Sequence, residues 1–303
     1  MFRRVHMPSL GGATEWLNSG PLGAAELDGR VVVVNFWTLT CINWLRQEPY
    51  VRAWSQAYRD DGLLVVGVHT PEFSFEHDID DVRRAVEVRD IDYPVAQDND
   101  YAVWSAFANH YWPALYFVDG DGVIRDKHFG EGRYEESERI IQRLLGVERE
   151  LVSVEGVGVE AEADWDHLRT PETYLGNARG ERRAYEPPER LSLNHWALAG
   201  EWTIGAENVV LDQAGGSIAH RFHARDAHLV LSRGSAEPIP FCVLLDGLAP
   251  GRSRGVDVDE DGNGVLQDGR LYQLVRERDA VRERTLEIAF LEPGAQAHAF
   301  TFG

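Results

Sequence analysis

The sequence predicts two domains of different class: an α/β domain with a mixed sheet and helices on both faces, and an all-β sandwich after it. Two patterns indicate this division. In the first half, buried-strand runs alternate with amphipathic helical periods. In the second half, short strand patterns are separated by turn signals, and no long helical period occurs. The length of 303 residues suits two domains of ordinary size. We expect the α/β domain at residues 1–150, a linker at 151–170 and the sandwich at 171–303.

The first domain contains a continuous β-branched run, Val31–Phe36, which is typical of a strand covered on both faces. Near its end, Asp119-Gly120-Asp121-Gly122 is a strong hairpin signal. The alternation followed by a hairpin and a helix predicts a mixed sheet. The expected strands are Val31–Phe36, Leu63–Val68, Ala114–Val118 and Val123–Phe129, and the expected helices are Asn43–Tyr58, Asp80–Val88, Tyr101–Ala108 and Glu135–Leu145.

The second domain is introduced by an acidic, glycine-containing stretch, Val152–Asp164, which we interpret as a linker or as the first edge of the next unit. The short strands after it predict an antiparallel β-sandwich. These strands are expected at Glu201–Ile204, Ser217–Phe222, His228–Leu231, Phe241–Leu245, Arg270–Val275, Thr285–Phe290 and His298–Phe302.

The composition limits the possible partners and the location. The formal net charge is −20, and Lys127 is the only lysine. Such an acidic surface repels phosphate backbones and anionic lipid, so nucleic acid and membrane surfaces are poor partners. No apolar run is long enough to span a bilayer, and the N-terminus shows no signal-peptide pattern. We therefore expect a cytoplasmic protein, and no motif indicates a cofactor.

Cys41 lies where the Val31–Phe36 run turns into the helix pattern that follows. Unpaired backbone N–H groups and the helix dipole favour a thiolate at such a position, so we expect a lowered pKa and a nucleophilic sulfur. Trp44 stands three residues later, where a CxxC motif would carry its second cysteine. A mixed disulfide at Cys41 would then need an external thiol for its resolution.

The residues around Cys41 resemble those of TlpA-like thioredoxin-fold proteins. The likeness begins with Asn35-Phe36-Trp37 before Cys41, and Pro49 matches the proline in the first helix of that family. The stretch Trp112–Asp119 is similar to the family's cis-proline strand, with Pro113 as the cis residue. The resemblance implies a thioredoxin-like domain with disulfide chemistry, whose partners are a protein or small-molecule disulfide and an external thiol donor.

The second half is similar to the C-terminal region of the DipZ family of cytochrome c biogenesis proteins. The likeness is carried by Thr170–Gly176, Phe222–Asp226 and Ala299–Gly303. In that family a thioredoxin-like domain is joined to a β-sandwich similar to carbohydrate-binding modules. The resemblance therefore implies such a sandwich here, with a possible glycan ligand.

The neighbours of Cys41 follow from the sheet that the resemblance implies. Because the ends of neighbouring parallel strands share one edge, His69 and Glu72 are expected near Cys41. A protonated His69 would favour the thiolate, and Glu72 could act as a general base. The loop before Pro113 would bring Asn109 and His110 from the other side. We expect a substrate groove lined by Trp37, Thr38, Thr40, Asn43, Trp44, Trp112 and Pro113.

Two other functions remain open at this point. The redox fold could be degenerate, with the sandwich binding a glycan or a protein; Trp196 and Trp202 could supply a sugar-stacking platform, or they could belong to the core. Alternatively, Cys41 could reduce peroxide, since Thr38 precedes it by three residues as in peroxiredoxins, although Val34 replaces the proline of that motif.

A calcium site and a structural cysteine are the remaining candidates. Carboxylates at Asp257, Asp259, Asp261 and Asp268 have the spacing of oxygen ligands for Ca²⁺, but an acidic turn between strands explains the same residues. Cys242 lies in the apolar run Phe241–Leu245 and is expected to be a small buried hydrophobe. The sequence predicts no other metal site.

Overall fold

The computed structural model describes residues 5–185 and 187–303. The chain forms two compact units, and the boundary between them lies between Glu160 and Ala161. That boundary falls inside the acidic stretch interpreted as a linker. Among the described residues, none of the helices is both long enough and apolar enough to cross a membrane.

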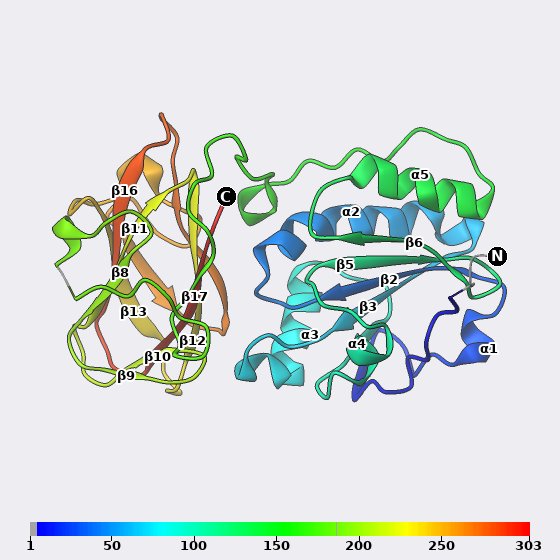
Figure 1. The fold of residues 1–303 in the computed structure, drawn as a ribbon, viewed down its shortest axis with the longest axis horizontal. Helices are drawn as coiled ribbons and strands as arrows, with labels where there is room; N and C mark the ends of the chain where they lie inside the picture. Colours follow the sequence, from blue (N-terminus) through cyan, green and yellow to red (C-terminus); the bar gives the residue numbers. More distant parts are fainter. Residues whose placement is uncertain (1–4, 186) are drawn as a thin grey trace. The chain divides into compact units, whose positions relative to one another are not determined.

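The first unit is built on a six-stranded mixed sheet with the order β1-β4-β3-β2-β5-β6 (Figure 1). Strands β2, β3 and β4 are parallel, whereas β1, β5 and β6 pair antiparallel with their neighbours. This arrangement confirms the mixed sheet. The strands are β1 (Glu15–Leu17), β2 (Val31–Trp37), β3 (Leu63–His69), β4 (Val95–Gln97), β5 (Ala114–Val118) and β6 (Ile124–Phe129).

Helices cover both faces of this sheet. Successive residues of β2 point to opposite sides, and all of them are buried, so both faces of the strand are packed against other elements. On one face Val32, Val34 and Phe36 form a core with Val103 and Phe107 of the α4 segment. On the other face lies α2, and α5 runs beside it (Figure 1). The helices are α1 (Ala24–Leu27), α2 (Ile42–Tyr58), α3 (Ile79–Val88), α4 (Ala102–Ala106) and α5 (Tyr134–Leu145), with 3₁₀ turns η1 (Arg59–Asp61), η2 (Ser74–His77) and η3 (Gly158–Glu160).

The register of the sheet brings several loops to one edge. Trp37 of β2 lies opposite His69 of β3, and His69 lies opposite Gln97 of β4, so these three parallel strands end together. Phe36 pairs with Ala114 at the start of β5, which places Pro113 beside the end of β2. The loops that follow β2 and β3 and the segment that precedes β5 therefore meet where Cys41 begins α2.

The second unit is a sandwich of two antiparallel sheets (Figure 1). One sheet has the order β15-β12-β17-β10-β9, with β7 paired to β17, and the other has the order β14-β13-β16-β11-β8. The strands are β7 (Thr173–Tyr174), β8 (Trp196–Ala199), β9 (Trp202–Ile204), β10 (Val209–Leu211), β11 (Ser217–His223), β12 (Asp226–Arg233), β13 (Ile239–Leu245), β14 (Asn263–Leu266), β15 (Arg270–Arg276), β16 (Glu283–Phe290) and β17 (Ala295–Phe302), with 3₁₀ turns η4 (Pro188–Arg190) and η5 (Gly251–Ser253).

A buried ion-pair network connects the neighbouring strands β12 and β15 of one sandwich sheet. The carboxylate of Asp226 is fully buried and accepts hydrogen bonds from Arg276 at 2.6 and 3.0 Å. Arg225 donates to it at 2.8 and 2.9 Å, and Gln273 donates at 3.3 Å. Burial alone would raise the pKa of Asp226, but the hydrogen bond from Arg276 and the charges of His228, Arg276 and Arg225 outweigh burial and lower it.

We expect Asp226→Asn to lower the free energy of unfolding of the sandwich by about 3–5 kcal/mol, because two guanidinium groups lose a buried partner. Urea unfolding followed by intrinsic fluorescence measures this loss. The folded pKa of Asp226 lies below its ordinary value of 3.8. The carboxylate therefore stabilises the fold fully at neutral pH, and this stabilisation is lost only as the pH falls below that value.

Glu283→Gln is the matched control for this experiment. Glu283 pairs with Arg221 at 2.9 Å on the surface of the same unit, and its side chain is 45% exposed. An exposed pair of this kind contributes below about 1 kcal/mol. Equal losses for the Asp226 and Glu283 variants would contradict the structural role assigned to the buried network.

Candidate active site

Cys41 is the N-cap residue of α2 and is partly exposed. Its backbone N–H donates to the carbonyl of Thr38 at 3.2 Å, and its carbonyl accepts from Leu45 N at 3.0 Å. The side chain forms no capping hydrogen bond, so the sulfur does not satisfy the first N–H groups of the helix. The strand-to-helix junction predicted for this cysteine is confirmed.

Trp44 is a fully buried packing residue. Its ring stacks on Trp37, with 4.1 Å between centroids and an interplanar angle of 17°. Its Nε1–H donates to Asn35 Oδ1 at 3.2 Å, and Asn35 in turn donates to Gln47 Oε1 at 2.9 Å. The guanidinium of Arg89 lies 5.6 Å from the indole centroid. The residue three positions after Cys41 is therefore a buried indole that packs in the interior of the unit.

His69 lies in the interior, at the end of β3. Its ring packs edge-on against Trp37 at 4.7 Å, and both ring nitrogens are buried without a hydrogen-bond partner in the structure. Burial, with a smaller contribution from the charge of His77, lowers its pKa to about 3. His69 is therefore neutral at physiological pH, which corrects the expectation of a protonated imidazole beside the thiol.

A buried carboxylate that sequence reasoning missed lies in the loop after β3. Glu76 Oε1 accepts hydrogen bonds from Thr40 Oγ1 at 2.7 Å and from Thr40 N at 3.2 Å. Its Oε2 accepts from the backbone N–H groups of Glu72 and Phe73 at 2.5 and 2.9 Å. Glu72, the acid chosen from the sequence, is half-buried in the same loop. The carboxylate that reaches the Cys41 loop is that of Glu76.

Burial raises the pKa of Glu76 to about 7, although hydrogen bonds from Thr40 and Phe73 oppose the rise. The charge of Glu72 adds to it. A carboxylic acid with this pKa gains and loses its proton near neutral pH, as a general acid or base must. No sequence motif distinguished Glu76 from Glu72 and the other acidic residues of this loop.

The segment before β5 approaches the same edge. The Trp112–Pro113 peptide bond is cis, as predicted from the resemblance. The Pro113 carbonyl accepts from Gly130 N at 2.9 Å, and Trp112 is half-buried against Trp104, 4.4 Å away. Asn109 is buried and accepts from Tyr116 OH at 3.1 Å, so it is a structural residue of this loop.

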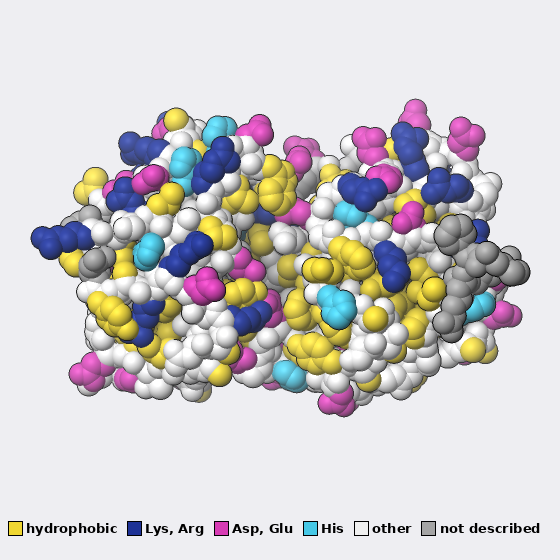
Figure 2. All heavy atoms as spheres, in the orientation of Figure 1, with side chains coloured by type: hydrophobic (Ala, Val, Ile, Leu, Met, Phe, Trp, Pro, Cys, Tyr) yellow, Lys and Arg dark blue, Asp and Glu magenta, His cyan; other side chains and the backbone are white. Residues whose placement is uncertain are grey.

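Aromatic side chains near Pro113 are exposed. Tyr111 is 56% exposed and Phe129 is 44% exposed, and their rings lie 5.2 Å apart. His110 is exposed beside Tyr111. Figure 2 shows hydrophobic side chains gathered on one face of the first unit. Exposed rings next to the β5 entry are suited to contact an extended peptide.

The groove expected from the sequence is less open than predicted. Trp37, Thr38, Thr40 and Trp44 are all buried, as is Pro113. Asn43 and Trp112 are half-buried and remain partly accessible. The indoles of Trp37 and Trp44 cannot contact a substrate in this arrangement, because they stack on each other and are fully buried in the core.

The carboxylates considered for calcium serve other purposes. Asp257 pairs with Arg270 at 2.7 Å and accepts from Gln273 N at 2.7 Å. Asp259 accepts from the backbone of Asp261 and Asn263 and so closes a turn. Across residues 5–185 and 187–303, no three acidic, histidine or cysteine side chains are grouped as a metal site would require. The acidic-turn interpretation describes Asp257–Asp261 better.

Cys242 is partly exposed, which corrects the expectation that it is buried. On β13, the residues Phe241, Val243 and Leu245 face the core, so Cys242 lies on the alternate face. Burial and the charge of Asp259 raise the pKa of its thiol. Cys41 and Cys242, both within the described residues, form no disulfide.

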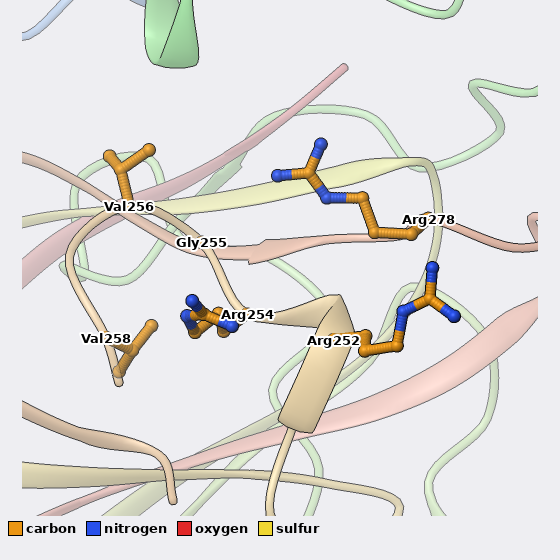
Figure 3. A pocket seen from close by; sticks show the side chains of 6 residues that line it. All are labelled: Arg252, Arg254, Gly255, Val256, Val258 and Arg278. Atoms are coloured by element: carbon orange, nitrogen blue, oxygen red, sulfur yellow. The ribbon is translucent and has the colours of Figure 1, made fainter. Parts of the chain in front are cut away.

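Neither Trp196 nor Trp202, the two tryptophans considered for a sugar-stacking platform, is fully exposed. Trp196 is 1% exposed and belongs to the core, whereas Trp202 is half-buried and packs edge-on against Phe290. A pocket of about 460 Å³ in this unit is lined by Arg252, Arg254, Gly255, Val256, Val258 and Arg278 (Figure 3). Its lining contains guanidinium groups and no aromatic ring, so it lacks the stacking surface on which the glycan hypothesis depends.

The arrangement defines a class of protein. A mixed sheet with a cysteine at the start of the helix after β2, and a cis-proline at the start of the antiparallel strand beside it, is a thioredoxin-like redoxin fold. Comparison with protein families agrees with this class. Residues 14–127 match the "AhpC/TSA family", and residues 170–303 match the "Thioredoxin like C-terminal domain".

Known proteins narrow the class further. The thiol-disulfide oxidoreductase YkuV of Bacillus subtilis is 32% identical over 143 residues, which are 47% of this chain and 95% of YkuV. Protein DipZ of Mycobacterium tuberculosis is 36% identical over 240 residues, 74% of this chain and 34% of DipZ. A solved thioredoxin-like protein in its oxidised form is 31% identical, with a TM-score of 0.44 over 48% of this chain and 98% of that protein. The chain belongs to the thioredoxin-like redoxins that include the thiol–disulfide oxidoreductases.

The extent of these matches differs between relatives. The first unit alone corresponds in length to almost the whole of YkuV. The chain spans about a third of the length of the DipZ protein it matches. The similarity to DipZ therefore shows that the two proteins are related. It does not assign the activity of the whole DipZ protein to this chain.

We expect Trp44→Ala to lower the free energy of unfolding of the first unit by about 3–5 kcal/mol, because it removes a buried ring that no neighbour can replace. Trp44→Phe keeps an aromatic ring and loses the hydrogen bond to Asn35, so we expect a smaller loss of about 1–3 kcal/mol. Chemical unfolding monitored by circular dichroism measures both. An alanine variant as stable as the wild type would show that Trp44 is not the packing residue described.

Proposed function

We propose that this protein is a thiol–disulfide oxidoreductase in which Cys41 is the single nucleophile and an external thiol completes the reaction. The observation that carries the proposal is the pairing of a partly exposed Cys41 at the start of α2 with a fully buried Trp44 three residues later. The first residue can react, and the second has no sulfur and no access. The names of YkuV and related proteins support disulfide chemistry at this site.

The proposed reaction has three exchanges. The Cys41 thiolate attacks one sulfur of a substrate disulfide, forms a new S–S bond and releases the other sulfur as a thiolate. An external thiol of low molecular mass then attacks the Cys41 sulfur of this mixed disulfide, releases the bound half of the substrate as a thiol and leaves Cys41 joined to the external thiol. A second molecule of the external thiol attacks the outer sulfur of that new disulfide, which regenerates Cys41 and joins the two external thiols in a disulfide. Both halves of the substrate are reduced, and the external thiol is oxidised.

The surroundings of Cys41 support a substrate of extended backbone. Pro113 lies beside the end of β2, and the exposed rings of Tyr111 and Phe129 flank the entry to β5. A peptide carrying a disulfide can use such a surface, because aromatic side chains provide contact area without sequence-specific charge. Half-buried Asn43 and Trp112 are the groove residues that remain partly accessible to it.

The cytoplasmic location stays a prediction.

We expect iodoacetamide to alkylate Cys41 at pH 7 at least about tenfold faster than Cys242, because a helix N-terminus favours the thiolate whereas burial and Asp259 raise the pKa of the Cys242 thiol. Peptide mass spectrometry of the native protein, with Cys41→Ser and Cys242→Ser as matched variants, separates the two rates. A Cys41 that reacts no faster than Cys242 would count against the proposal.

We expect Cys242→Ser to reduce a peptide disulfide with glutathione as fast as the wild type, and Cys41→Ser to show only the uncatalysed rate. Insulin reduction followed by turbidity measures both. Loss of turnover in Cys242→Ser, with a trapped mixed disulfide at Cys41, would show that the second cysteine resolves the intermediate. If Cys41 instead yields a dimedone-trapped sulfenate with peroxide and no disulfide turnover, the one-cysteine peroxide hypothesis replaces this one.

A further inference from the structure

Glu76 connects two loops at the active edge of the first unit. One carboxylate oxygen accepts from both the N–H and the hydroxyl of Thr40, the residue that directly precedes Cys41. The other oxygen accepts from Glu72 N and Phe73 N in its own loop. The side chain is fully buried, so water does not replace any of these contacts. Burying a carboxyl group costs free energy unless the group is hydrogen-bonded. Two of the hydrogen bonds that offset this cost for Glu76 come from Thr40, on the loop that carries Cys41.

We propose that Glu76 is the proton-exchanging and positioning residue for Cys41, acting through the Thr40 hydroxyl. This inference rests on the function proposed above for Cys41. In this proposal Glu76 accepts and returns the thiol proton of Cys41. Its carboxylate accepts hydrogen bonds from Thr40, Glu72 and Phe73, and its proposed effect on the sulfur is indirect. Glu72, the acid expected from the sequence, contributes its backbone N–H and its charge to Glu76 in this arrangement.

The proton balance of the step is as follows for a dialkyl disulfide. The thiol proton of Cys41 passes by way of the Thr40 hydroxyl to the Glu76 carboxylate, which leaves a thiolate and a neutral acid. The thiolate forms an S–S bond to one substrate sulfur, and the old S–S bond breaks with its electron pair on the other sulfur. That sulfur takes the proton back from Glu76 and departs as a thiol, so charge and protons are conserved.

The charged surroundings of Glu76 are compatible with this exchange. Burial raises its pKa to about 7, Thr40 and Phe73 lower it, and the charge of Glu72 raises it. His69, on the strand that leads into this loop, is neutral because burial lowers its pKa to about 3. Exposed His77 follows Glu76 directly, and its ring nitrogen is bonded to the Ser74 carbonyl. Glu76 is thus a buried group of this loop whose charge changes near neutral pH.

The test compares Glu76→Gln with Glu48→Gln. Glu48 is a matched control, since it is also fully buried in the first unit and burial also raises its pKa to about 7. Its charge is balanced by Arg52, 3.7 Å away, and by Arg89, not by the Cys41 loop. Alkylation of Cys41 by iodoacetamide is measured from pH 5 to 9 in all three proteins. The wild type and Glu48→Gln should show two inflections, one of them near pH 7, whereas Glu76→Gln should show a single ionisation.

A second measurement uses the leaving group. At pH 7, exchange with an aromatic disulfide, whose thiolate leaves without a proton, is compared with exchange with hydroxyethyl disulfide, whose thiol needs one. Glu76→Gln should raise the ratio of aromatic to alkyl rates at least about tenfold, and Glu48→Gln should leave it unchanged. A purely structural role for Glu76 would slow both substrates alike.

Thr40→Val keeps the carboxylate and removes the hydroxyl through which Glu76 is proposed to act on Cys41. It should raise the same ratio, and it serves if Glu76→Gln does not fold. An unchanged pH profile and an unchanged ratio in both variants, with Cys41 still reactive, would overturn the role of Glu76 while leaving the proposed function intact. A wild-type Cys41 that fails to react at any pH would overturn the proposed function and this inference with it.

Discussion

The stacking of Trp44 on Trp37 packs the first turn of α2 against the core of the first unit. The pair lies in the core, and the hydrogen bond from Trp44 to Asn35 connects the first turn of α2 to the centre of β2. Asn35 extends this connection to Gln47, whose amide donates to the Gly130 carbonyl at 3.1 Å. The helix that begins at Cys41 is thus held to the sheet by polar contacts in its interior. Because an indole occupies this position, the first turn of α2 carries no second cysteine after Cys41.

The features predicted correctly from the sequence are those encoded locally. The strand Ala114–Val118 is found with the same bounds, and Val31–Phe36 and Leu63–Val68 each extend by one residue. A run of β-branched residues or a hairpin turn carries its own signal, so these elements can be read without knowledge of their neighbours. The short strands β1, β4 and β10 were not predicted. Three residues are too few to show a period, and their extended backbone depends on pairing with distant strands.

The residues of the candidate site likewise fall into those that the sequence marks locally and those that only the fold brings together. Cys41 and the cis Pro113 are marked by their place in the chain, whereas Glu76 was missed, because its importance arises from a hydrogen bond across 36 residues of sequence. His69 was placed at the correct edge with the wrong charge. Exposure and ionisation depend on which side chains surround a group, and the sequence alone does not contain that information. Cys242 shows the same limit, since an apolar run does not reveal which alternate residues of a strand face outward.

Two buried acids with raised pKa values have a consequence for the scaffold as a whole. Glu48 and Glu76 both bind protons more tightly in the folded unit, where each pKa is about 7, than in an unfolded chain, where the ordinary value is 4.5. The contribution of these two acids to folding is therefore largest at acidic pH and falls as the pH rises from 4.5 to about 7, whereas the lowered pKa of His69 acts in the opposite direction. The two buried acids therefore weaken the first unit between acidic and neutral pH, and they add no further loss once both are ionised.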